Sequence, residues 1–420
     1  MRRALPVAEL GLALVAAIAA TAGAHALVAA LGLDATDRLA AGIGPVWAAA
    51  MVAVAVAAHV VERRVRRPAR ARMAVALLAG LAAGLAGAPL MAGLLHTAQP
   101  PYGVLAGDMA FRAEYVTRFA ATWHLADYTF RGLDAFYPPA WFWLAGRTAD
   151  LAGAVPWHVV KPFTILTLGA ALLVAYGLWR MVLTPAGSAS AAIGSSLLLT
   201  TQLPHVAGYA TQGWYSPYSC FVAVTGAAWL AGALAATGAH RAHGRLAVVT
   251  LVGAVLALTY YLLFALLVVV LLGLAAFPAA GRRTRLLRAG AVCGGVALLT
   301  AVFWVPLVAA VVSGAAAQGH FVRPDFLGVS TGLGGPPALA VLASVAIALL
   351  ALTIAAPASR AVAGVLAGSA LYQLASVASL VVAHDQWQPH RAATMMAAAF
   401  GAAVPVALDA LRSGGTVLDL

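Results

Sequence analysis

Long apolar segments alternate with short polar stretches along the whole chain. A helix rises about 1.5 Å per residue, so crossing a hydrocarbon layer of about 30 Å takes roughly 17 to 25 residues. The apolar segments are close to this length, and they lack the two-residue alternation that marks membrane strands. We therefore predict about twelve membrane-spanning helices. Their approximate ranges are 7–31, 43–61, 73–98, 162–179, 188–203, 216–236, 246–260, 262–277, 289–312, 337–354, 361–382 and 392–410.

The composition indicates the same class of protein. Of the 420 residues, 63% are hydrophobic and only 9% are charged, whereas soluble domains carry about 25% charged residues. The net charge of +12 would suit a nucleic-acid-binding protein, but the arginines cluster just outside the apolar spans. We expect an all-α, polytopic transmembrane helix bundle and no nucleic-acid partner.

The densest arginine cluster lies between the second and third predicted spans. Such clusters stay on the cytoplasmic side of a membrane. Alternation of the spans then places residues 99–161 outside, as the main extracytoplasmic loop of one membrane domain, residues 1–420. We expect a multi-pass protein of the cell membrane whose active face is extracytoplasmic. The cluster consists of Arg63, Arg64, Arg66, Arg67, Arg70 and Arg72.

The predicted outer loop is unusual because charged and aromatic residues crowd together in it. The pattern predicts a short helix from Asp108, with Asp108 as its N-cap. Phe111, Tyr115 and Phe119 recur every four residues on one face of this helix, and we expect that face to lie on the membrane surface.

Asp108 is the foremost candidate for catalysis. A carboxylate at the mouth of a membrane-embedded cleft can accept the proton of an attacking hydroxyl group, and a helix N-cap is an equally good interpretation. Glu114 is a candidate substrate-binding residue, although its spacing from Arg118 favours a surface ion pair. Aromatic candidates for substrate binding are Tyr137, Trp141, Trp214 and Trp387, with an interfacial aromatic belt as the alternative for the tryptophans.

Further polar outer loops supply cations. Guanidinium groups match the geometry of phosphate, while contact with membrane lipid headgroups explains the same residues equally well. The chain has no nucleotide-binding fingerprint and no metal-binding motif, so we expect no cofactor and no metal. The candidate phosphate-binding residues are Arg323, Arg391, His390 and His320, with Arg112 in reserve.

Three segments carry a family resemblance: GDMAFR at 107–112, YVTR at 115–118 and FYPPAWFW at 136–143. With them the chain resembles the membrane-embedded N-terminal region of the AftA family, the actinobacterial galactan 5-O-arabinofuranosyltransferases of the GT-C class. The resemblance implies a glycosyltransferase that uses decaprenylphosphoryl arabinofuranose as donor and cell-wall galactan as acceptor. It also implies a catalytic role for Asp108, and it leaves open a role for Asp34 and Asp37 in an earlier outer loop. Full-length family members have a C-terminal extracytoplasmic domain, which we expect this chain to lack.

Two other functions fit the pattern. One is a transporter or flippase for a lipid-linked sugar, and the other is a GT-C transferase for a different polyprenyl-phosphate sugar. Carriers place ionisable residues near the middle of the bilayer, whereas the predicted spans are almost free of charge at their centres. This distribution favours the enzyme.

Overall fold

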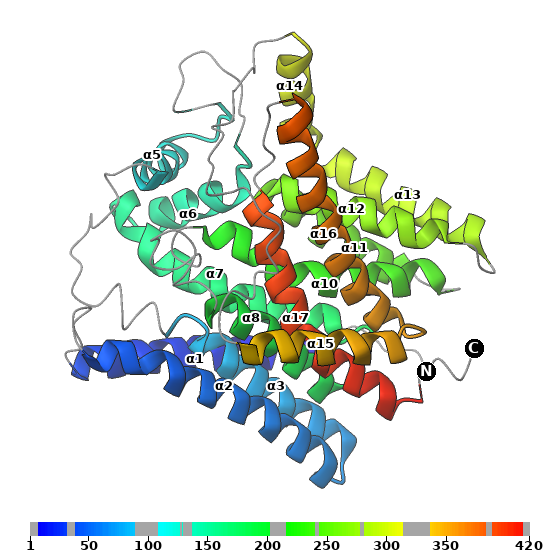
Figure 1. Ribbon diagram of the computed structural model, residues 1–420. Coiled ribbons are helices and arrows are strands. Elements are labelled where there is room, and N and C mark those ends of the chain that lie inside the picture. The colour runs from blue at the N-terminus through cyan, green and yellow to red at the C-terminus, as the bar shows by residue number, and fades with distance from the viewer. Residues whose placement is uncertain are drawn as a thin grey trace.

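Every described element of the chain is a helix. The computed structural model describes residues 7–31, 38–88, 108–126, 128, 137–201, 216–239, 243–277, 281–313, 337–383 and 389–414. The helices, drawn in Figure 1, are α1 (Val7–Leu31), α2 (Arg38–Arg64), α3 (Pro68–Leu85), α5 (Asp108–Ala121), α6 (Ala140–Leu151), α7 (Pro156–Trp179), α8 (Pro185–Thr201), α10 (Pro217–Gly238), α11 (His243–Thr259), α12 (Tyr261–Ala276), α13 (Arg282–Leu299), α14 (Ala301–Val312), α15 (Pro337–Leu352), α16 (Pro357–Ala383) and α17 (Pro389–Arg412).

Seven of the described helices are long and apolar enough to cross a membrane, or eight if the bent pair α13 and α14 counts as one span. The chain is therefore an all-helical, multi-pass membrane protein. α1 has the bounds predicted from the sequence. α7 starts six residues before its predicted span, so the end of the predicted outer loop is already helical. The segments predicted at 246–260, 262–277 and 337–354 form shorter apolar helices, and twelve spans are thus not established.

The segment predicted as one span at 289–312 is broken. α13 and α14 meet at an angle of 80°. Between them lies Thr300, whose side-chain hydroxyl donates a hydrogen bond of 2.8 Å to the carbonyl oxygen of Val296. The backbone of Thr300 leaves the helical region, with φ −107° and ψ 7°, and hydropathy does not register such a local change.

Glycines bring the helix backbones into close contact. Gly80 and Gly84 of α3 face α1, where a Cβ atom at Gly84 would lie only 2.5 Å from the carbonyl oxygen of Ala17. Gly194 of α8 and Gly401 of α17 face each other, and a Cβ atom on either would collide with the carbonyl group of the other. Small residues permit this approach, which is a principal source of helix association in membranes.

α5 and α6 pack against each other rather than spreading on a membrane surface. Tyr115 and Phe119 of α5 are almost fully buried, and the Tyr115 ring lies 5.5 Å from the ring of Phe142 in α6. Gly146 allows α6 to pass directly over Phe119 and the backbone of α5. The expected membrane-facing aromatic face is therefore wrong, because a second helix provides a closer apolar partner. In Figure 1 this pair lies well away from α1, α2 and α3.

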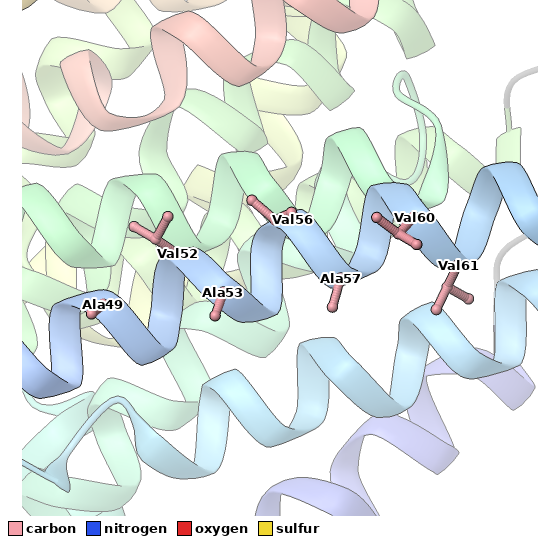
Figure 2. Close-up of a pocket in the computed structure, with 7 residues that line it drawn as sticks. All are labelled: Ala49, Val52, Ala53, Val56, Ala57, Val60 and Val61. Carbon is pink, nitrogen blue, oxygen red and sulfur yellow. The ribbon is translucent and has the colours of Figure 1, made fainter.

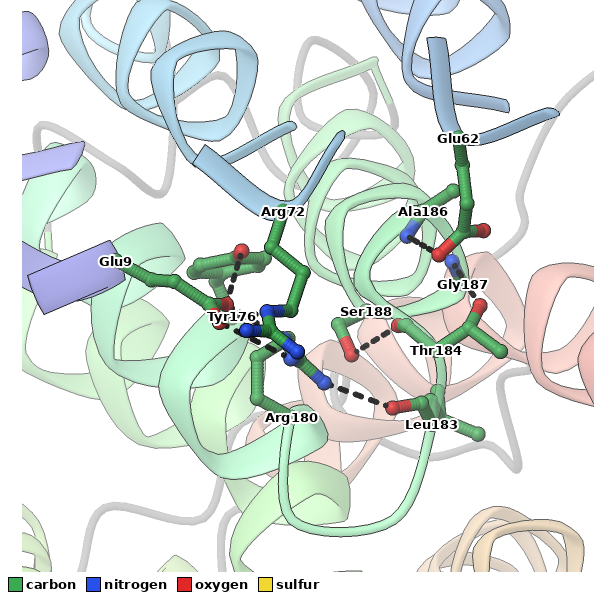
Figure 3. Close-up of polar contacts among 10 residues, drawn as sticks. All are labelled: Glu9, Glu62, Arg72, Tyr176, Arg180, Leu183, Thr184, Ala186, Gly187 and Ser188. Atoms are coloured by element: carbon green, nitrogen blue, oxygen red, sulfur yellow. Dashed lines mark hydrogen bonds and ion pairs between the residues drawn. The ribbon is translucent and has the colours of Figure 1, made fainter. Parts of the chain in front are cut away.

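An ionic cluster, which we call the Glu9 cluster, lies at the C-terminal end of α7. Arg180 Nε lies 2.9 Å from a carboxylate oxygen of Glu9, and Arg72 Nε lies 3.4 Å from the other oxygen. The hydroxyl of Tyr176 donates to the same carboxylate over 3.5 Å. These side chains join the start of α1 to α3 and to the end of α7 (Figure 3). The carboxylate lies between two guanidinium groups, so the buried Arg180 has a counter-charge in direct contact while the three charges together sum to +1.

Candidate functional site

Five side chains from distant parts of the chain meet where α10, α12 and α17 begin. They are Arg112 of α5, Tyr137 just before α6, Tyr218 of α10, Tyr260 between α11 and α12, and Arg391 of α17, and we call them the tyrosine–arginine cluster. Arg112 Nε donates a hydrogen bond of 3.2 Å to the Tyr218 hydroxyl. That hydroxyl also lies 2.9 Å from the hydroxyl of Tyr137.

Two phenol rings connect the two arginines. The rings of Tyr218 and Tyr260 stack with their centroids 5.9 Å apart. The Arg112 guanidinium carbon lies 5.6 Å from the Tyr218 ring centroid, and that of Arg391 lies 5.7 Å from the Tyr260 centroid. A cation over an aromatic face is attracted by the electrons of the ring and keeps its full charge. Each of the two guanidinium groups thus lies over a phenol ring of the cluster.

Most side chains of the cluster are buried, which makes their contacts important for stability. Arg112 is 2% exposed, Arg391 is 6% exposed and Tyr218 is completely buried. Removing a guanidinium group from water is costly unless it is solvated by hydrogen bonds or by an opposing charge. Burial also raises the pKa of Tyr137 well above its ordinary value, so this phenol remains neutral and keeps its proton for donation. Chemically, such a place suits an anion.

The structure brings together some of the residues predicted from the sequence. Arg391, Arg112 and Tyr137 belong to the tyrosine–arginine cluster. The Trp141 ring lies 5.9 Å from Tyr218, and its indole nitrogen donates a 2.8 Å hydrogen bond to Thr167, so Trp141 forms part of the wall of the cluster.

Other predicted residues lie beyond what the structure describes. Asp108 is the first residue of α5, one helical turn before Arg112, and His390 directly precedes Arg391 in α17, but both side chains fall outside the description. The residues wholly outside the described ranges are Arg323, His320, Trp214, Trp387, Asp34 and Asp37.

Tyr218 and Tyr260 were not singled out as functional residues from the sequence. Their positions gave a partial signal, because Tyr218 lies in the first turn after a polar outer stretch and Tyr260 lies in the short link between two predicted spans. α11 ends at Thr259 and α12 begins at Tyr261, so this link is a single residue.

The other face of α5 lines an open groove of about 400 Å³, which we call the α5 groove. Its polar members are Glu114, Thr117 and Arg118, and the half-buried Trp157 of α7 closes one side. The predicted ion pair between Glu114 and Arg118 is wrong, since no ion pair joins these two described side chains. Exposed pairs of this kind gain little energy over hydration, which explains why it does not form.

A larger groove, of about 690 Å³, runs along α2 and is entirely apolar. Figure 2 shows the alanine and valine side chains that line it, from Ala49 to Val61. A surface without hydrogen-bonding side chains can accept a hydrocarbon chain but cannot orient a sugar or a phosphate. Within the described ranges, no three His, Cys, Asp or Glu side chains gather closely enough to hold a metal ion.

Several actinobacterial proteins named galactan 5-O-arabinofuranosyltransferase are similar to this chain. The protein from Mycobacterium tuberculosis is 47% identical over 76 residues, which is 18% of this chain and 12% of the relative. That from Mycolicibacterium smegmatis is 32% identical over 215 residues, or 49% of this chain and 32% of the relative. That from Corynebacterium glutamicum is 34% identical over 93 residues, or 22% and 14%.

These alignments cover well under two thirds of the relatives' own length. A match that extends over nearly the whole chain comes from a protein family. The family described as "Arabinofuranosyltransferase N terminal" matches residues 5–417. With its helical membrane architecture and this end-to-end match, the chain belongs to the arabinofuranosyltransferase N-terminal family, AftA_N.

Proposed function

We propose that this chain is the membrane region of a glycosyltransferase that moves arabinofuranose from decaprenylphosphoryl arabinofuranose to cell-wall galactan. The acceptor and the sugar follow from the names of the relatives, and the lipid-linked donor follows from the sequence resemblance and from the chemistry of the site. The reaction takes place at the extracytoplasmic face of the cell membrane. The arginine cluster predicted to be cytoplasmic supports this orientation. One of its members, Arg72, contacts Glu9 beside Arg180, just after the C-terminal end of α7. Trp141, beside the tyrosine–arginine cluster, contacts α7 far from that end, at Thr167.

The observation that carries the proposal is the pair of buried arginines, Arg112 and Arg391, in one cluster. A polyprenyl-phosphate sugar brings a phosphodiester anion to the edge of the bilayer. As the bond between the sugar and the phosphate breaks, the leaving phosphate gains negative charge. Oriented guanidinium groups stabilise this transition state more than the ground state, and only such differential binding accelerates the reaction.

Asp108 is the proposed general base. Its carboxylate takes the proton of the galactan hydroxyl as that oxygen forms a bond to the anomeric carbon of arabinofuranose, and decaprenyl phosphate leaves with the electrons of the broken bond. Position 108 lies one turn before Arg112 on α5, so base and phosphate-binding cation are carried by one rigid helix. Arg323, His320 and His390 are proposed to assist with the phosphate. Tyr137, Trp141, Trp214 and Trp387 are proposed to surround the sugars.

The test is sugar transfer by the purified full-length chain. Decaprenylphosphoryl arabinofuranose, labelled in the sugar, is incubated with the protein and a synthetic galactan oligosaccharide, and we expect labelled oligosaccharide. Transfer only from a different polyprenyl-phosphate sugar would show that the proposed donor is wrong. Movement of labelled donor across proteoliposomes without transfer would identify a transporter instead.

The orientation of the chain in the membrane is tested by a separate measurement. Single cysteines are placed at Ala126 or Ala69 in a variant with Cys220→Ala and Cys293→Ala, and intact cells are treated with a membrane-impermeant thiol reagent. We expect labelling at position 126 and none at position 69. The reverse pattern would place the tyrosine–arginine cluster at the cytoplasmic face and contradict the proposal.

A further inference from the structure

The α5 groove combines four kinds of chemistry in a small space. It offers the carboxylate of Glu114, the hydroxyl of Thr117, the guanidinium group of Arg118 and the indole ring of Trp157. Its volume of about 400 Å³ lies within the usual range of small-molecule sites, roughly 300 to 1,000 Å³. Thr117 donates a hydrogen bond to the carbonyl oxygen of Ala113, which leaves its oxygen lone pairs for a ligand.

The charged side chains of the groove are not engaged in hydrogen bonds or ion pairs within the described part of the chain. Among the described contacts, Glu114 and Arg118 have no hydrogen bond or ion pair with another side chain. A neighbouring pair on α6 behaves differently, since Arg147 and Asp150 form an ion pair of 3.2 Å. A carboxylate and a guanidinium group held side by side without pairing are both available to hydrogen bond a ligand.

These groups indicate a neutral carbohydrate. Each sugar hydroxyl both donates and accepts, so a carboxylate and a guanidinium group can bind neighbouring hydroxyls of one ring. The apolar face of a sugar ring suits a flat aromatic side chain with a polar edge, as Trp157 provides. The groove holds one negative and one positive side chain, so its charges cancel. That balance fits an uncharged polyol better than a phosphate-bearing headgroup.

The groove lies on the opposite side of α5 from the tyrosine–arginine cluster. Residues turn by about 100° each along a helix, so positions 112 and 114 point about 200° apart. Arg112 faces inward to Tyr218, whereas Glu114 faces the groove. One helix of 14 residues therefore separates the place proposed for the donor phosphate from a second place that suits sugar.

We infer that the α5 groove is a binding site for a stretch of the galactan acceptor, with Trp157 as its stacking platform and Glu114 and Arg118 as its hydrogen-bonding residues. The inference rests on the proposed function only for the identity of the carbohydrate. It adds an acceptor site some distance from the reacting atoms. Such a site holds a polymer in place while one of its terminal or internal hydroxyl groups reacts.

The test measures binding and catalysis separately. Binding of a lipid-free galactan tetrasaccharide to the purified protein is followed by saturation-transfer NMR. Glu114→Gln removes the negative charge of the carboxylate and keeps the shape of the side chain. We expect roughly tenfold weaker binding of the tetrasaccharide. Trp157→Ala removes the platform, with a loss of at least roughly tenfold, and Trp157→Phe should recover part of it.

Matched controls isolate the groove. Trp123 is exposed and lies under Arg147 and edge-on to Trp143, outside the groove, so Trp123→Ala should bind the tetrasaccharide like the wild type. Binding of decaprenyl phosphate should be the same in Glu114→Gln, Trp157→Ala and the wild type. In the transfer assay, the groove variants should raise the KM for the oligosaccharide and leave the KM for the donor unchanged.

The outcomes separate this inference from the proposed function. If the wild type transfers sugar while Glu114→Gln and Trp157→Ala bind tetrasaccharide normally, the groove is not an acceptor site and the function stands. If the wild type does not transfer sugar but the tetrasaccharide binds through the groove, the site stands and the function fails. If brominated phospholipid quenches more fluorescence in the wild type than in Trp157→Phe, and the tetrasaccharide does not relieve this difference, lipid occupies the groove and the inference is overturned.

Discussion

The two buried polar clusters of this protein hold arginine in different ways. In the Glu9 cluster, Arg180 lies against a carboxylate, and the opposite charges cancel at short range. In the tyrosine–arginine cluster, Arg112 and Arg391 lie over the phenol rings of Tyr218 and Tyr260. The first arrangement ties helices together, and we propose that the second binds the phosphate of the donor. Arginine burial alone therefore does not distinguish the two clusters, whereas the chemistry of the neighbouring side chains does.

This comparison predicts that substitutions near the tyrosine–arginine cluster change turnover while the protein stays folded. Substitutions in the Glu9 cluster should change stability while turnover per folded molecule stays the same.

The largest effect is expected from Asp108→Asn. The amide has nearly the shape of the carboxylate but cannot accept the proton of the acceptor hydroxyl. Loss of a general base typically lowers the rate by about 10²- to 10⁴-fold. Turnover is measured with the labelled donor, and the melting temperature in detergent serves as the control for folding. Wild-type turnover in a folded variant would reduce Asp108 to a helix cap.

Arg391→Lys is expected to lower turnover by roughly 10²-fold, as removal of one transition-state hydrogen-bond donor commonly does. The lysine ammonium group keeps the charge but lacks the planar fork of a guanidinium group. Arg412→Lys, at the other end of α17, is the matched control and should keep normal turnover. Equal turnover in both variants would show that Arg391 does not touch the reacting phosphate.

Glu9→Gln should destabilise the protein without lowering the turnover per folded molecule. The substitution leaves Arg180, which is 8% exposed, without its counter-charge, and breaking a buried ion pair in this way costs about 3 to 5 kcal/mol. Asp150→Asn breaks a pair whose carboxylate is 56% exposed and should cost about 1 kcal/mol or less. Thermal melting of both variants gives the comparison. A similar drop for the two would mean that the Glu9 cluster contributes no more than a surface pair.

The smallest expected effect comes from replacing one tyrosine by phenylalanine in each cluster. Tyr218→Phe removes a hydroxyl that Arg112 and Tyr137 both contact, and we expect donor KM to rise by roughly five- to tenfold. Tyr176→Phe removes a hydroxyl that makes one long contact with Glu9, and it should leave donor KM unchanged. If the two substitutions have equal effects on donor KM, the distinction between the clusters fails.

Hydropathy was sufficient to predict a helical membrane protein and the bounds of several helices. The bounds of α1 and, within two residues, of α10 follow from runs of apolar residues, because the thickness of the hydrocarbon layer dictates their length. The break at Thr300 could not be predicted in this way, since it is a change of backbone conformation at one residue inside a continuous apolar segment.

The candidate site was only partly predictable for a different reason. Arg112, Tyr137 and Arg391 are predictable because charged residues are rare in this chain and gather, together with aromatic residues, in the predicted outer segments. Their meeting with Tyr218 could not be foreseen, since the hydrogen bond from Arg112 to Tyr218 joins residues 106 positions apart. One-dimensional patterns carry no information about which helix ends meet.

Helix α17 also determines when the site is complete during biosynthesis. Its first turn supplies Arg391, and its last turns supply Asp409, which accepts hydrogen bonds from the backbone nitrogen and the side chain of Thr184. These positions are roughly 27 Å apart at about 1.5 Å per residue. Because the ribosome adds residues 389–412 after all the helices that α17 contacts, the second cation reaches Tyr260 only after those helices have been made. A nascent chain that has not yet inserted α17 therefore lacks half of the charge proposed to hold the donor.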